Sequence, residues 1–158
     1  MLNDAQNAKL LSKLRRAMEV FEPYIFTKVA QLPFVMYETA ERLETIPETS
    51  LFAPPAQRPS RFEWGGEGCY CWFLTQYTPP EELAGQPLYL YPELGGYEAM
   101  LWVDGQPYGT YATKIVVTRH GNHYCDRICA AAAPGTPIAL AIEFYAGHYV
   151  VGEQPFER

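Results

Sequence analysis

The chain has 158 residues, which is the length of one domain. Hydrophobic residues make up 48% of it and charged residues only 19%, a balance that provides a core and excludes intrinsic disorder. Twelve Lys and Arg against 18 Asp and Glu give a net charge of −6, so there is no general electrostatic attraction to nucleic acid or to an anionic membrane.

The first 46 residues read as a helical lead-in. Asn3 and Gln6 have the spacing of a capping box, which marks a helix start. The apolar positions at helical spacing that follow are Leu10, Leu14, either Ala17 or Met18, and Phe21. The same period predicts a second helix over residues 24–31, ended by Pro33, and a short helical turn around residues 39–43.

Residues 47–60 form a Pro-rich connection, with Pro54 and Pro55 at its centre. Too few apolar residues recur there for a regular element, so we expect the connection to run extended over the surface. From residue 61 the apolar pattern changes to a period of two, and we expect residues 61–158 to form one β domain.

Strand-like segments with turn signals between them fill the β domain. The expected strands are residues 69–76, 88–91, 97–103, 106–108, 114–118 and 138–145. Gly95-Gly96 and Asp104-Gly105 mark turns, and a helical turn is expected within residues 78–83. Without helices between the strands, the pattern predicts a mainly β fold: an antiparallel β-sandwich of the jelly-roll or galactose-binding-like type, preceded by the N-terminal helical segment.

No targeting segment or membrane span is visible. The N-terminus lacks a basic flank followed by an apolar run, so it does not read as a secretory signal. The most apolar stretch, residues 130–142, is interrupted by Pro134 and Pro137. We therefore expect a cytoplasmic protein whose cysteines are thiols, and Cys69 and Cys71 lie near the limit of what a disulfide can bridge.

One short segment holds four zinc-ligand types, namely His120, His123, Cys125 and Cys129. Structural zinc sites normally use two separated pairs of ligands, so we favour a polar loop followed by half-buried cysteines and predict no metal site in this chain.

Catalytic patterns are also missing. The chain has neither the Gly-x-Ser-x-Gly elbow of α/β-hydrolases nor a phosphate-binding glycine loop. The carboxylates weighed as an acid–base pair are Glu93, Glu98, Asp104 and Glu143. Nothing in their spacing selects a pair; Asp104 reads as a turn residue and Glu143 as an outward-facing strand residue. We predict no catalytic residue.

Three tryptophans are candidates for a sugar-stacking platform, because an indole offers a broad apolar face and one N–H donor. Trp72 and Trp102 lie inside predicted strands, which favours packing in the core. Trp64 precedes Gly65-Gly66 at a strand end or loop, and it is the candidate ligand-binding residue.

Four segments together resemble a known family: residues 71–73, 79–88, 95–108 and 137–148. Their order and spacing are similar to the N-terminal region of α-mannosidases of glycoside hydrolase family 38, in the cytoplasmic or vacuolar branch. The resemblance covers residues 61–148 and implies a β-sandwich that precedes a catalytic domain. The family reaction that it implies is zinc-dependent hydrolysis of α-mannosides with retention.

The family's His-x-Asp zinc pair does not follow His120, His123 or His148, so no catalytic residue carries over. Residues 111–114 also depart from the more polar stretch of relatives. The resemblance therefore implies a non-catalytic N-terminal domain whose partner is the catalytic domain of a longer polypeptide, which would hold the zinc. Two alternatives stay open: a stand-alone carbohydrate-binding module, and a protein-interaction module that uses the first helix.

Overall fold

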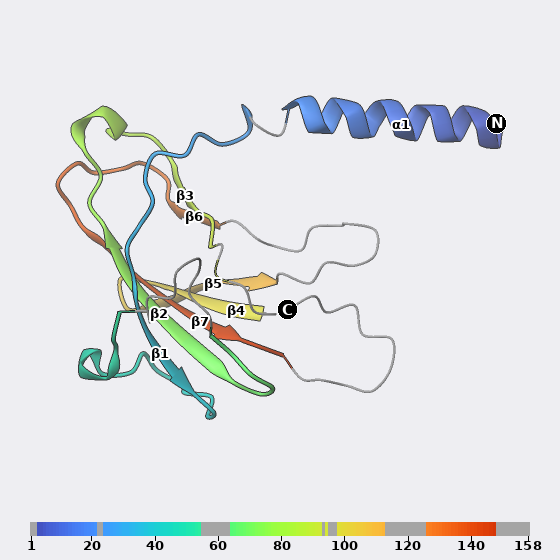
Figure 1. The fold of residues 1–158 in the computed structure, drawn as a ribbon. Coiled ribbons are helices and arrows are strands. Elements are labelled where there is room, and N and C mark those ends of the chain that lie inside the picture. The colour runs from blue at the N-terminus through green and yellow to red at the C-terminus, as the bar shows by residue number, and fades with distance from the viewer. Residues whose placement is uncertain are drawn as a thin grey trace. The chain divides into compact units, whose positions relative to one another are not determined.

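The computed structural model describes residues 3–21, 24–54, 64–92, 94, 98–112 and 126–147 (Figure 1). The chain divides into two compact units, Met1–Gln31 and Leu32–Arg158. One N-terminal helix is followed by mainly antiparallel β-sheet, which confirms the predicted β class and the helix at its start.

Helix α1 spans Asp4–Phe21. The predicted capping box is present: the Gln6 amide donates to Asn3 Oδ1 at 2.9 Å, and the Asn3 amide donates to Gln6 Oε1 at 3.0 Å. No residue of α1 is buried, and Met18 and Phe21 are 70% and 66% exposed.

The second helix predicted over residues 24–31 is wrong. Only a single turn forms at residues 24–25, and residues 26–34 have no helical structure. Pro23 and Pro33 restrict both ends of a segment that is too short to sustain a helix alone. The helical turn predicted around residues 39–43 is also wrong, since strand β1, Val35–Thr39, ends there in a bend.

Five antiparallel strands form the main sheet, in the order β1-β2-β7-β4-β5 (Figure 1). Their bounds, beyond β1, are Tyr70–Tyr77 for β2, Glu98–Val103 for β4, Gln106–Ala112 for β5 and Ile138–Tyr145 for β7. Strand β7 lies at the centre, between β2 and β4. The strands predicted at residues 69–76, 97–103 and 138–145 are confirmed to within two residues, and the return strand from residue 106 extends to Ala112.

Strands β3, Leu88–Leu90, and β6, Asp126–Cys129, pair as a second, two-stranded sheet. Sequence reasoning found β3 and missed β6, because its four residues carry two charges and only one fully buried apolar side chain, Ile128. The predicted strand at residues 114–118 and the Gly95-Gly96 turn lie outside the described residues.

Short turns connect these strands. The 3₁₀ helix η3, Glu81–Leu83, is the helical turn predicted within residues 78–83. The expectation that the Pro-rich connection holds no regular element is wrong at its start, where a 3₁₀ helix, η2, forms at Thr49–Leu51 and Ala53 then pairs with Met36 beside β1. Residues 55–60 of the connection lie outside the described residues.

The hairpin between β4 and β5 turns at Asp104-Gly105, as predicted. Both residues have positive φ, 50° and 76°, which a two-residue hairpin turn of this kind requires. The Asp104 side chain also accepts a hydrogen bond from the Ala139 amide at 2.9 Å. Asp104 therefore fixes the hairpin to the start of β7.

The main core lies on one side of the five-stranded sheet, which we call the inner face. Its buried side chains come from the sheet and from the small β3–β6 sheet. They include Cys71, Phe73, Leu88, Leu101, Tyr111, Ile128, Leu140, Ile142 and Phe144. Phe73 and Phe144 meet edge to face at its centre, with ring centroids 5.9 Å apart.

Candidate functional site

Trp64, the predicted ligand-binding residue, lies at the edge of the inner-face core. Its ring centroid is 5.6 Å from that of Phe73 and 6.1 Å from that of Phe144. The indole N–H donates to the Leu94 carbonyl at 2.5 Å. Trp64 is thus half-buried with its donor satisfied, which is a packing role; its ligand-binding role stays a prediction.

Three of the four cysteines lie in the described residues, and Cys69, Cys71 and Cys129 are all free thiols, as expected. Burial raises the pKa of the Cys71 thiol above its ordinary value, and the Glu38 carboxylate on the neighbouring strand raises it further. Cys71 is therefore an unreactive core residue.

The zinc-ligand cluster cannot be placed as a whole, because His120, His123 and Cys125 lie outside the described residues, as do Glu93 and His148. Within the described ranges, no three His, Cys, Asp or Glu side chains come together as metal ligands.

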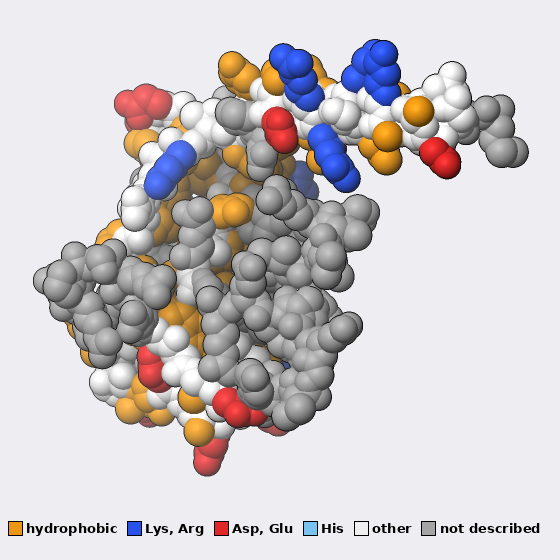
Figure 2. All heavy atoms as spheres, turned by 45° about the vertical axis from the view of Figure 1, so that its right-hand side comes forward, with side chains coloured by type: hydrophobic (Ala, Val, Ile, Leu, Met, Phe, Trp, Pro, Cys, Tyr) orange, Lys and Arg blue, Asp and Glu red, His pale blue; other side chains and the backbone are white. Residues whose placement is uncertain are grey.

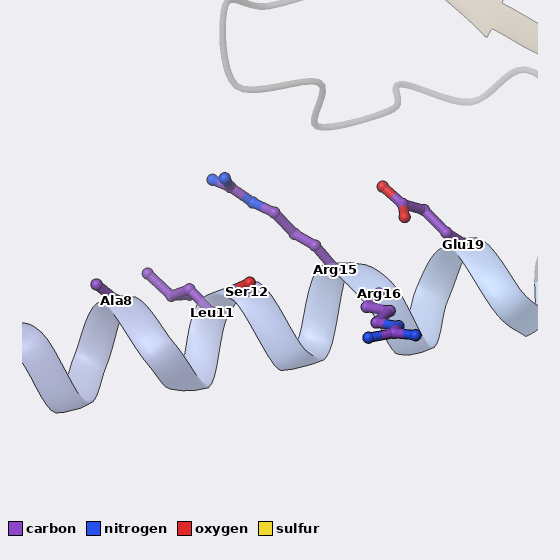
Figure 3. Close-up of a pocket in the computed structure, with 6 residues that line it drawn as sticks. All are labelled: Ala8, Leu11, Ser12, Arg15, Arg16 and Glu19. Carbon is purple, nitrogen blue, oxygen red and sulfur yellow. The ribbon is translucent and has the colours of Figure 1, made fainter.

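A surface hollow runs along α1 and is drawn in Figure 3. Its lining side chains all belong to this helix: Ala8, Leu11, Ser12, Arg15, Arg16 and Glu19. Hydrophobic and basic side chains both lie at the surface of α1 (Figure 2). A hollow formed by one exposed helix does not converge polar groups on a ligand, so it is not a built site.

The second side of the five-stranded sheet, which we call the outer face, carries a different set of residues. Strand registry places Tyr37, Trp72, Glu143 and Met100 in one row across β1, β2, β7 and β4. Because side chains alternate along a strand, these residues face away from the main core. Trp72 is nevertheless fully buried, which confirms the prediction that its ring packs inside the protein. It does so on the outer face and not in the main core.

Trp72 and Trp102 approach each other across β7, with ring centroids 6.1 Å apart and ring planes inclined by 43°. The neighbouring row on the outer face consists of Leu74, Ala141 and Trp102, on β2, β7 and β4. The small Ala141 side chain lies between the other two. The short Ala141 side chain leaves space above β7 for the two indoles to meet.

Glu143 is the only buried charged residue among the described ones, with 8% of its surface exposed. Glu143 does face away from the main core, as expected of an outward strand residue, but it is buried there because the chain after β1 covers it. The Leu43 backbone N–H donates to the carboxylate, and Arg42 lies close. Burial raises the pKa of Glu143 above its ordinary value of 4.5, and the Leu43 hydrogen bond and the Arg42 charge oppose that shift.

Residues 40–52, which we call the strap, supply this cover. Besides the contact of Leu43 with Glu143, the Phe52 ring packs on Tyr37, with centroids 5.9 Å apart. Two backbone hydrogen bonds of 2.8 and 3.0 Å then join Met36 to Ala53 just beyond the strap. The strap and the outer-face side chains that it contacts form a second layer on this side of the sheet.

Three polar atoms in this layer are buried without a hydrogen-bond partner in the described part of the chain: Trp72 Nε1, Trp102 Nε1 and Glu143 Oε1. We call Trp72, Trp102 and Glu143 the outer-face cluster. Sequence reasoning missed it because it treated each residue singly. The available signal was that both faces of residues 69–76 are apolar, and that Glu143 is flanked by Ile142 and Phe144.

Comparison with known proteins found no match: no family model, no curated protein and no solved structure is similar to the chain at a significant level. Within the described residues, no helix combines the length and apolar character needed to cross a membrane.

Proposed function

We propose that the chain is a non-catalytic domain of a zinc-dependent retaining α-mannosidase, and that it packs against a catalytic domain which holds the zinc and the catalytic carboxylates. One observation carries this proposal. The described parts of all four segments that resemble the glycoside hydrolase family 38 enzymes belong to the same compact unit, at β2, at η3, at the β4–β5 hairpin and at β7.

Residues within these segments have structural tasks in the fold. Asp104 and Gly105 form a hairpin turn, and Pro79 is almost fully buried. Gly85 adopts a φ of +73°, which glycine tolerates best, and its N–H donates to the Ala132 carbonyl at 2.9 Å. Residues that shape turns and packing support a scaffold role for the resembling region.

We propose further that the two sheets are the layers of a β-sandwich of the jelly-roll or galactose-binding-like type. The inner-face core draws side chains from both sheets, which supports this arrangement. Nuclear Overhauser contacts from Leu88 and Ile128 to Leu101 and Phe144 test it; their absence would contradict a two-layered packing.

The mannosidase assignment is tested by an activity and zinc measurement on the purified chain. We expect no turnover of an aryl α-mannoside with added zinc, and no stoichiometric zinc in the protein. A known family 38 enzyme assayed in parallel provides the positive control. Turnover by the chain itself would overturn the proposal.

The coding sequence beyond Arg158 gives the second test. A long continuation that contains a His-x-Asp motif would support the parent enzyme, whereas a stop codon would favour a stand-alone carbohydrate-binding module.

A second candidate function is self-association through α1. It is favoured by the absence of any buried residue in this helix and by its exposed Leu10, Leu14, Met18 and Phe21. Sedimentation equilibrium over a concentration series tests it, with Leu14→Glu as the disrupting variant and Lys13→Glu as the control. A mass that stays monomeric throughout would rule it out.

A further inference from the structure

The outer-face cluster gathers polar groups that the fold itself does not satisfy. Trp72 is fully buried and Glu143 is 8% exposed, yet two indole donors and one carboxylate oxygen lack a partner in the described residues. An unpaired buried polar group destabilises a fold, so native proteins rarely keep several together without a use for them.

Strand pairing holds these three side chains close to one another. Trp72 and Glu143 are registry partners on β2 and β7, while Trp102 is a diagonal neighbour of Glu143 on β4. The two rings meet above Ala141, at 6.1 Å between centroids. Rigid sheet positions, rather than loops, therefore set the geometry of the cluster.

The donor and acceptor types select the class of ligand. An indole N–H only donates, and an ionised carboxylate only accepts, so the complementary group is one that does both, a hydroxyl. The Glu143 carboxylate disfavours an anion, and a single unpaired carboxylate oxygen does not provide the oxygen shell of a hard cation. The indole faces add apolar contact for a ring or carbon chain.

We propose that the outer-face cluster binds a neutral, hydroxyl-bearing ligand of the sugar or polyol class. Its hydroxyl groups accept from the Trp72 and Trp102 indoles and donate to Glu143. This site is distinct from Trp64, whose N–H is already bonded to Leu94 beside the inner-face core.

The strap determines access to the site. Most of its residues are exposed, and its described contacts with the sheet are few: the Leu43 N–H to Glu143 and the Phe52 ring on Tyr37. A segment with few buried contacts opens at low cost. The half-buried Trp102 and Tyr37 form the partly open border through which the ligand enters.

The three indole N–H groups provide a direct test on the intact chain. With ¹⁵N-labelled tryptophan, each of the three gives one resonance, assigned by Trp→Phe variants. Titration with methyl α-mannoside, myo-inositol and glycerol should shift the Trp72 and Trp102 resonances saturably for at least one probe. The Trp64 resonance should stay in place and serves as the internal control.

Variants of Glu143 and Trp102 test the assigned contacts. Glu143→Leu should weaken binding by about tenfold or more, since it removes a hydrogen bond to a charged group. Trp102→Phe removes one donor while it keeps an aromatic ring, and it tests the proposal independently of whether the Glu143 variant folds. Full affinity in both variants would overturn the proposal.

A bound water molecule has the same hydrogen-bonding chemistry, and the titration separates it from a ligand. If no probe shifts the two resonances while cross-peaks from long-lived water to both indoles are present, the cluster holds water only and the proposal is overturned. Equal shifts of all three indoles would indicate non-specific effects and would overturn it as well.

Discussion

The two faces of the five-stranded sheet are covered by different kinds of side chain and by different parts of the chain. The inner face buries apolar side chains against a second sheet, and its aromatic rings meet in edge-to-face contacts. The outer face holds the buried Trp72 and Glu143 and the half-buried Trp102, and three of their polar atoms have no partner among the described residues. Apolar packing on the inner face thus stabilises the fold, whereas the unpaired polar atoms of the outer face lower its stability.

The largest loss of stability should come from removing an aromatic side chain from the inner-face core. Phe144→Ala removes a fully buried ring from the central strand and should lower the free energy of unfolding by about 3–5 kcal/mol. Met100→Ala, which faces outward and is half-buried, is the control and should lose clearly less. Urea unfolding measures both, and equal losses would erase the distinction between the faces.

A matched pair of tryptophan substitutions sharpens the comparison. Trp64→Phe breaks the hydrogen bond to Leu94 and leaves that carbonyl unpaired, so it should cost about 1–2 kcal/mol. Trp102→Phe makes the same change of side chain but removes a donor that has no partner, so its cost should be smaller. The reverse order in urea midpoints would show that the outer face depends on its indole N–H.

Replacement of the buried carboxylate tests the outer face most directly. Glu143→Leu removes an unpaired oxygen at similar volume, and stability should stay within about 1 kcal/mol or rise. Loss of the Leu43 contact opposes the gain. A loss comparable to that of Phe144→Ala would show that Glu143 is a structural anchor.

The same variant should change the dependence of stability on pH. Since the folded pKa of Glu143 is raised above 4.5, its contribution is fully present below the unfolded pKa and is lost as pH rises through the folded pKa. The Leu variant lacks this loss, so its stability relative to the natural chain should increase from acidic to neutral pH. A difference independent of pH would contradict the raised pKa.

The smallest effect should come from the helix. Deletion of residues 1–31 removes a segment whose helix has no buried residue. The free energy of unfolding of the remaining chain, measured by urea unfolding, should therefore differ from that of the full chain by less than about 0.5 kcal/mol. A larger loss, with the full chain measured alongside, would show that α1 supports the β unit.

Periodicity and turn chemistry were enough to predict most of the sheet. Residues 69–76 and 138–145 alternate over eight positions, and Asp104-Gly105 sets its turn by backbone preference alone, so all three could be located. Strand β1 was missed because five residues carry too little pattern, and its identity depends on pairing with β2.

The outer-face cluster could not be predicted from the sequence for a related reason. Its residues come from β2, β4 and β7 and are brought together only by strand order and register. Burial of Glu143 depends on the strap, which carries no regular pattern. Inner-face residues such as Phe73 and Ile142 were predictable as buried because they are apolar residues inside clearly marked strands.

The close approach of Trp72 and Trp102 above Ala141 also gives the protein an optical signature. Two indole chromophores at this separation and inclination should couple their electronic transitions, and we expect an exciton contribution to the circular dichroism that belongs to neither ring alone. This contribution should disappear when either tryptophan is replaced or when the rings separate. Circular dichroism could therefore report the packing of Trp72 against Trp102 on the outer face without any added label.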